Sequence, residues 1–146
     1  MKKYTAFVLL FTLALGAFAQ TKPTPKKEQD YYEIKTLPIP KEIYLEVGGL
    51  ATMPDGRLAV STRRGEIWIV ENPYQKTSHQ TYYRRFASGL HEVLGLAYKD
   101  GAFYCSQRGE LTKISDTDRD GVADLYEPIY TFDLSGNYHE YTYGPV

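Results

Sequence analysis

The sequence has little cysteine and no excess of basic charge. The single cysteine, Cys105, has no partner for an intrachain disulfide, so its expected role is a small buried side chain in a strand. The formal net charge is -1, with 17 Lys and Arg against 18 Asp and Glu. A chain without a positive field does not gather phosphate backbones, so the composition argues against nucleic acid as the partner.

Long hydrophobic runs are also missing, except at the N-terminus. Two lysines precede an apolar run at residues 6–15, and the small-residue sequence Ala17-Phe18-Ala19 follows it. This order predicts a secretory signal peptide, residues 1–19, that is cleaved after Ala19. The alternative is a membrane anchor, but the run is shorter than the roughly 20 residues that a spanning helix needs. We therefore expect an exported protein, periplasmic or extracellular, with no membrane span after cleavage.

A polar segment follows the predicted signal peptide. Its first eleven residues, QTKPTPKKEQD, include three lysines and two prolines and contain nothing that could be buried. This composition predicts a flexible linker over residues 20–36. The folded domain is expected over residues 37–146.

An internal repeat organises this domain. Three short motifs recur after 46, 45 and 44 residues: Gly49-Leu50-Ala51 as Gly95-Leu96-Ala97, Asp55-Gly56 as Asp100-Gly101, and Arg64-Gly65-Glu66 as Arg108-Gly109-Glu110. Asp-Gly between apolar runs is a strong hairpin signal, because glycine takes the positive φ that the turn needs. Each unit is predicted to begin with a strand and to continue with strands at residues 58–62 and 66–70, or 102–106 and 110–115.

A period of about 45 residues with roughly four strands is typical of a propeller blade. The sequence therefore predicts an all-β fold, a partial β-propeller of about two blades, with a third blade starting at Tyr143-Gly144-Pro145. The alternative is a β-sandwich built from hairpins. Because propellers usually need about four to eight blades to close, we expect the chain to be the N-terminal part of a longer protein.

An acidic loop at residues 116–127, DTDRDGVADLYE, has the spacing of a calcium-binding loop. Gly121 would allow the sharp turn, and five carboxylates within twelve residues repel one another unless a hard cation gathers them. The alternative is a solvated acidic turn. The predicted ligands are the side chains of four aspartates and one glutamate and the Val122 carbonyl: Asp116, Asp118, Asp120, Val122, Asp124 and Glu127.

The flanks of this loop are not those of a helix-loop-helix hand. Pro128 follows Glu127 directly and removes a backbone donor where an exiting helix would grow. The entering segment, residues 111–115, belongs to a predicted strand. We therefore expect an isolated calcium loop between β-elements, with a structural role.

Two histidines occupy equivalent places in the repeat. His91 lies four residues before Gly95, and His139 lies five residues before Gly144. The first strand of a blade starts at the end of a propeller's channel where ligands enter, so a histidine there could act as a general base. The alternative is a hydrogen-bonded histidine at a strand end. His79 is expected to be an exposed turn residue.

Residues 49–60, GLATMPDGRLAV, together with residues 64–70, RGEIWIV, resemble the first blade of the soluble quinoprotein glucose/sorbosone dehydrogenase superfamily, whose members are six-bladed propellers. The second blade and its acidic loop resemble a bacterial branch of glucose/sorbosone or membrane-bound dehydrogenases, some fused to c-type haem domains. The similarity covers roughly residues 37–146. It implies oxidation of a sugar or alcohol by pyrroloquinoline quinone (PQQ), with a haem domain or cytochrome as electron acceptor.

His139 matches the family's catalytic histidine, which takes the hydroxyl proton while hydride passes to the quinone, although its spacing to the next blade is shorter here. The quinone's partners and its calcium ligands would come from later blades, so the fragment alone is expected to be inactive. Two alternatives stay open. One is a non-catalytic, calcium-stabilised propeller that binds carbohydrate or protein, and the other is a calcium-bearing propeller that performs hydrolysis or lactone chemistry.

Overall fold

The computed structural model describes residues 24–74, 80–133 and 141–145 of the chain. The predicted signal peptide and His139 lie outside these residues. The chain consists of two compact units, and the boundary between them falls after Ile34. In the first unit, the described residues carry one 3-10 turn, η1 at Glu28–Asp30, in which the Lys27 N–H donates to the Asp30 carboxylate at 2.8 Å. No helix within the described ranges is long and apolar enough to cross a membrane.

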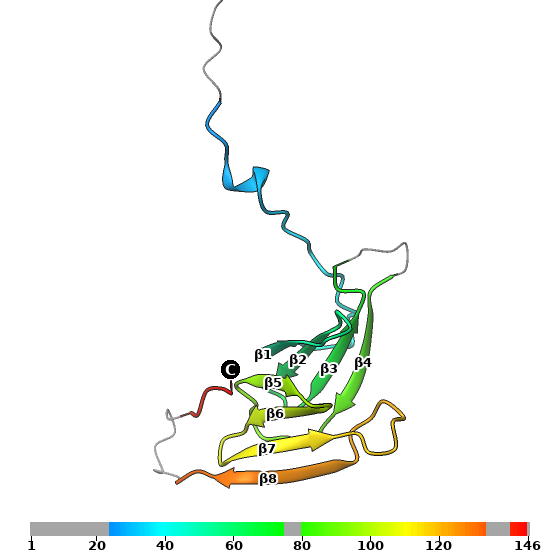
Figure 1. Ribbon diagram of the computed structural model, residues 1–146, viewed down its shortest axis with the longest axis vertical. Coiled ribbons are helices and arrows are strands. Elements are labelled where there is room, and N and C mark those ends of the chain that lie inside the picture. Colours follow the sequence, from blue (N-terminus) through cyan, green and yellow to red (C-terminus); the bar gives the residue numbers. More distant parts are fainter. Residues whose placement is uncertain (1–23, 75–79, 134–140, 146) are drawn as a thin grey trace, which may run out of the picture. The chain divides into compact units, whose positions relative to one another are not determined.

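The second unit holds two four-stranded antiparallel sheets, which confirms the all-β prediction (Figure 1). In each sheet the strands follow one another in chain order. The first sheet contains β1 Val47–Thr52, β2 Leu58–Thr62, β3 Ile67–Glu71 and β4 Tyr82–Ala87. The second sheet contains β5 Leu96–Lys99, β6 Ala102–Ser106, β7 Glu110–Ser115 and β8 Leu125–Thr131. The predicted bounds of β2, β6 and β7 are confirmed, and β3 is shifted by one residue.

Glycine turns join the strands as the repeat predicts. Gly56 has φ 86° and donates its N–H to the Met53 carbonyl at 2.9 Å. In the second sheet Asp100 and Gly101 both have positive φ, 50° and 84°, as a two-residue hairpin turn with two left-handed residues requires. The Asp-Gly pairs therefore close the first hairpin of each sheet.

The two sheets also share details that the sequence motifs do not show. A one-residue register shift occurs between Ile67 and Trp68 in the first sheet, and another between Leu111 and Thr112 in the second. Each shift leaves one extra residue in the fourth strand, Phe86 in β4 and Ile129 in β8, which is the geometry of a β-bulge. The repeat therefore includes the bulges of the two fourth strands.

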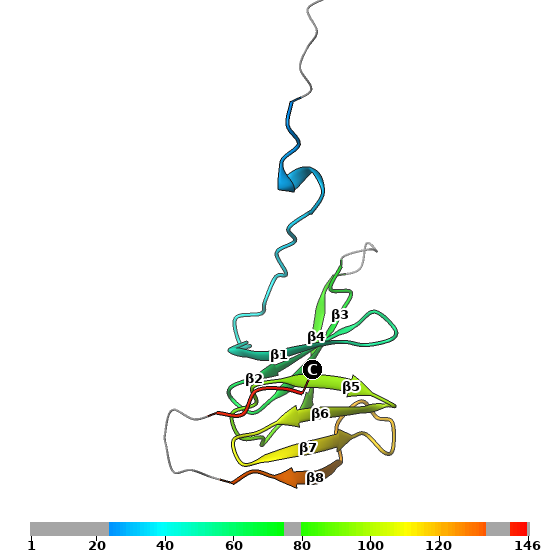
Figure 2. The ribbon, with the colours of Figure 1, turned by 60° about the vertical axis from the view of Figure 1, so that its left-hand side comes forward.

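The sheets pack against each other with β1 beside β5 (Figure 2). A methyl group on Gly49 would lie 2.7 Å from the Gly95 carbonyl carbon, so only glycine allows this approach. The hydrophobic core draws on both sheets, and the Phe86 ring from β4 meets the Phe103 ring from β6 at 5.0 Å between centroids. Cys105 is fully buried in β6, as predicted, and burial raises the pKa of its thiol to about 12.

Residues 141–145 continue this pattern on the other side of β5. The Gly144 N–H donates to the Leu94 carbonyl at 3.3 Å. A methyl group on Gly95 would lie 1.9 Å from the Gly144 carbonyl oxygen. Gly144 therefore approaches Gly95 as closely as Gly95 approaches Gly49.

Candidate metal centre

The acidic loop connects β7 to β8 at one end of the second sheet. Both flanks are strands, as predicted. Glu127 and Pro128 lie within β8, the outermost strand of its sheet, where the missing N–H of a proline is tolerated next to a bulge. The loop therefore leaves a strand and enters a strand, without the exiting helix of a calcium hand.

Three of the predicted ligands lie together. One carboxylate oxygen from each of Asp116, Asp118 and Asp120 comes within 4.8 Å of the other two. Asp116 is half-buried, and the other two side chains are exposed. Charges at such distances repel one another, so a cation among these oxygens would remove an unfavourable interaction.

Backbone N–H groups of the loop hold these carboxylates in place. Asp116 accepts hydrogen bonds from the N–H groups of Arg119 at 2.7 Å and Gly121 at 2.8 Å. Asp120 accepts one from the Val122 N–H at 2.8 Å. Because each carboxylate oxygen has more than one lone pair, these bonds orient the oxygens and leave further acceptor capacity.

The turn of the loop depends on two residues in the left-handed region. Arg119 has φ 65° and Gly121 has φ 92°. The predicted role of Gly121 at the sharp turn is consistent with this angle. Arg119 adopts the same region with a side chain, which costs of order 1 kcal/mol or more, and the hydrogen bond from its N–H to Asp116 offsets part of that cost.

The other two predicted carboxylates have different partners. Asp124 accepts hydrogen bonds from the Thr117 N–H at 2.8 Å and from the Thr117 hydroxyl. Both bonds lower the pKa of Asp124 below its usual value, and the bond from the hydroxyl contributes the larger share. Glu127 forms an ion pair with Lys113, its cross-strand neighbour, at 2.8 Å. The structure thus brings together three of the five predicted acidic ligands.

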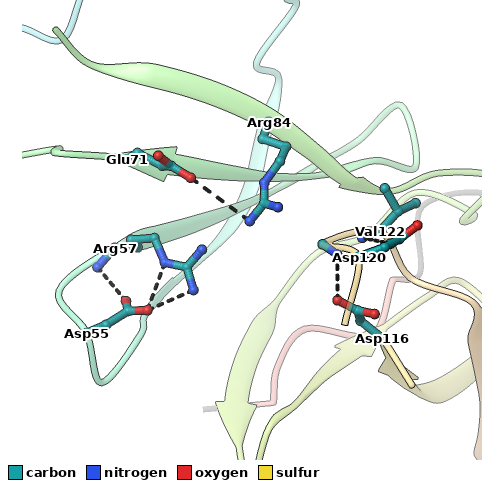
Figure 3. A network of polar contacts seen from close by, with 8 residues as sticks. Asp55, Arg57, Glu71, Arg84, Asp116, Asp120 and Val122 are labelled. Atoms are coloured by element: carbon teal, nitrogen blue, oxygen red, sulfur yellow. Dashed lines mark hydrogen bonds and ion pairs between the residues drawn. The ribbon is translucent and has the colours of Figure 1, made fainter. Parts of the chain in front are cut away.

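The loop is attached to the first sheet as well as to its own. The Ala123 N–H donates to the carbonyl of Phe86, the bulge residue of β4, at 2.7 Å. The guanidinium of Arg84, also in β4, fills the space over Gly121, because a methyl group there would lie 1.7 Å from its Nη1. Figure 3 shows Arg84 between the loop and Glu71, whose carboxylate lies 4.0 Å from Arg84 Nη2. The loop therefore bridges the two sheets.

His91 is the only histidine within the described ranges, since His79 and His139 lie outside them. It is exposed at the start of the second repeat, and its Nε2 lies 4.0 Å from a Glu92 carboxylate oxygen. Sequence reasoning missed the role of Glu92. This residue has φ 45° and pairs with Arg63 of the first sheet at 3.6 Å and with Arg108 of the second at 3.2 Å.

A cleft of about 410 Å³ lies between the end of β4 and the second sheet. Its polar side chains bond mainly to one another. The Gln107 amide donates to Glu110 at 3.0 Å and to Thr112 at 2.7 Å, and the Thr112 hydroxyl donates to Glu110 at 2.6 Å. This network fixes the β6–β7 turn and offers few unused groups to a ligand.

The fold and the loop together define an all-β protein of two repeated four-stranded sheets with a bridging acidic loop. The chain matches no protein-family model, no curated protein sequence and no solved structure.

Proposed function

We propose that residues 116–124 bind a calcium ion whose role is to brace the two sheets. The observation that carries this proposal is the meeting of Asp116, Asp118 and Asp120 within 4.8 Å on a loop that is hydrogen-bonded to the neighbouring sheet. Calcium prefers oxygen ligands and takes six to eight of them, so three carboxylates would be completed by a backbone carbonyl and water.

The ligand set follows from the contacts of the loop. The three clustered aspartates would bind directly, and the Val122 carbonyl would follow them in the usual order of a calcium loop. Asp124 would join directly or through water if the ion draws it from Thr117. Glu127 would have to leave Lys113 and is held in β8, so its contribution is the weakest.

Calcium should raise the melting temperature of the chain, because an ion that binds only the folded state stabilises it by mass action. At a calcium concentration about 100 times the Kd, the gain is about 2.7 kcal/mol. Calorimetry with and without calcium measures it. Asp116→Ala with Asp120→Ala should abolish the rise, and Asp30→Ala, a charge change in the first unit, should keep it. An unaltered chain whose melting temperature ignores calcium would contradict the proposal.

We also propose that the two sheets are blades of a β-propeller. Three repeated features support this arrangement: chain-order antiparallel sheets, bulges in both fourth strands, and close glycine contacts from Gly49 to Gly95 and from Gly95 to Gly144. A regular step between successive first strands is what a radial array of blades requires. A β-sandwich would place its sheets face to face without this step along the first strands.

For the intact protein we propose an exported dehydrogenase that oxidises a sugar or alcohol with a quinone cofactor. The support is the sequence resemblance of the blade motifs and the place of His139 before the third repeat. His139→Ala in the full gene product should leave the melting temperature unchanged and abolish turnover with added PQQ. His91→Ala, at the equivalent place one repeat earlier, is the matched control and should retain turnover. Turnover that survives His139→Ala would mean that His139 is not the general base. A full gene product that binds carbohydrate without oxidising it would instead favour a non-catalytic propeller.

A further inference from the structure

We infer that the outward side of the second sheet is an interface, and that its occupant is a third four-stranded sheet of the same repeat. This side, called the far face here, points away from the first sheet. It carries the ion pair of Lys113 with Glu127 and five apolar or aromatic residues of four strands: Ala97, Tyr104, Leu111, Ile129 and Tyr130. The inference rests on the proposed propeller and adds to it the surface through which the array continues.

The far face is equivalent in register to a buried face of the first sheet. Strand pairing aligns the apolar or aromatic residues of the far face, one by one, with Ala51, Ala59, Ile67, Phe86 and Ala87. All five of these first-sheet residues belong to the hydrophobic core. None of their far-face equivalents is buried, and Ile129 and Tyr130 are 51% and 63% exposed. The second sheet therefore repeats the core-forming face without a partner over it.

A similar difference in burial occurs on the other side of each sheet, where the covered residue now belongs to the second sheet and the exposed one to the first. Leu50 and Leu96 are equivalent, since Leu50 pairs with Val60 and Leu96 with Cys105. Leu96, which meets the first sheet, is 5% exposed, whereas Leu50 is 57% exposed. This difference is confined to the first strands, because Val60 and its equivalent Cys105 are both buried. The Leu50 and Leu96 pair is thus buried where a neighbouring sheet covers it and exposed where none does.

The occupant follows from residues 141–145. These residues occupy the place beside β5 that β5 occupies beside β1, with Gly144 against Gly95. A second copy of the chain could not put its own β1 there, because the position is taken. The far face is therefore set to receive the sheet that this segment begins.

The charged side chains of the far face pair with each other, so the face carries no net charge that would require a charged partner. Its only ion pair within the described residues joins Lys113 to Glu127 at 2.8 Å, and the two charges cancel. Lys113 is the equivalent of Ile69 in the core of the first sheet. The rings of Tyr130 and Phe132 lie side by side, with 5.7 Å between their centroids, which extends the aromatic surface. A surface that is apolar and locally neutral favours packing over charge steering.

Tyrosine labelling tests the inference on unaltered protein. The full gene product, isolated as the cell makes it, and the 146-residue chain would be treated with N-acetylimidazole and mapped by mass spectrometry. Tyr130 should be modified readily in the 146-residue chain and at least about tenfold more slowly in the full gene product. Tyr82 of β4 has a similar exposure, 59% against 63% for Tyr130, and is the matched control that should react equally in both.

The outcomes separate this inference from the proposals it rests on. Equal labelling of Tyr130 in the two proteins would overturn the inference. Protection of Tyr130 that disappears when the full gene product is diluted would also overturn it, because such protection comes from a second copy. The calcium-dependent melting temperature of the 146-residue chain is unaffected by either result. Ile129→Lys gives a second measurement: it should lower the melting temperature of the full gene product and leave that of the 146-residue chain nearly unchanged.

Discussion

The first and second sheets have the same backbone plan but different side chains at equivalent places. Glu66 of the first sheet accepts hydrogen bonds from the Trp68 indole at 2.9 Å and from Arg85 at 3.2 Å. Its equivalent, Glu110, accepts instead from Thr112 and Gln107. The bulges of the fourth strands are therefore repeated, whereas the hydrogen-bond partners of equivalent side chains differ between the sheets.

The loop after the third strand differs in sequence, since only that of the second sheet carries the acidic cluster. In the first sheet this connection is residues 72–81, and in the second it is the acidic loop that reaches back to β4. Arg84 meets the loop, whereas its equivalent in the second sheet is Glu127, which pairs within its own sheet. The side chain that meets the loop is therefore not repeated at the equivalent place of the second sheet.

The strongest test of the comparison exchanges equivalent bulge residues for alanine. Phe86→Ala removes a core ring that packs on Phe103 and should cost about 3–5 kcal/mol of unfolding free energy. Ile129→Ala, at the exposed equivalent place, should cost less than about 1 kcal/mol in the 146-residue chain. Urea unfolding measures both. Similar losses would show that the two faces are not differently covered.

A smaller effect should follow from the glycine contact between sheets. Gly49→Ala puts a methyl group 2.7 Å from the backbone of Gly95, and relief of this overlap should cost about 2–3 kcal/mol. Gly101→Ala is the control within one sheet. It has open space around it, so only its positive φ of 84° is penalised, by about 1 kcal/mol. Equal losses of unfolding free energy in Gly49→Ala and Gly101→Ala would mean that β1 and β5 can move apart without cost.

The sequence predicts the parts of this fold that local rules govern. Asp-Gly turns and apolar runs located β2, β6 and β7, and the spacing of the acidic residues located the loop. The fourth strands had no predicted bounds. β4 (YYRRFA) contains two arginines and β8 (LYEPIYT) contains a proline, so neither has the pattern of a central strand.

The ligand set was harder to predict, because it depends on register. Spacing alone placed Glu127 in the calcium shell, but the pairing of β7 with β8 puts it opposite Lys113. Likewise, Arg84 over Gly121 depends on how two sheets pack, which no local motif contains. Long-range contacts therefore decide which acidic residues of this loop lie together.

The smallest expected effect concerns a charge that only the first repeat carries. Arg57 donates to Asp55 at 2.8 Å and lowers the pKa of that carboxyl below its usual 3.8, whereas the second repeat has Ala102 at the equivalent place. A depressed folded-state pKa contributes stability above the unfolded value, and that contribution is lost as the pH falls through the folded value. NMR titration of the Asp55 carboxyl should show Arg57→Gln moving its pKa back toward 3.8. Arg85→Gln, which removes an arginine paired with Glu66, should leave the Asp55 pKa in place. A titration curve unchanged by Arg57→Gln would mean that the two turns do not differ in this interaction.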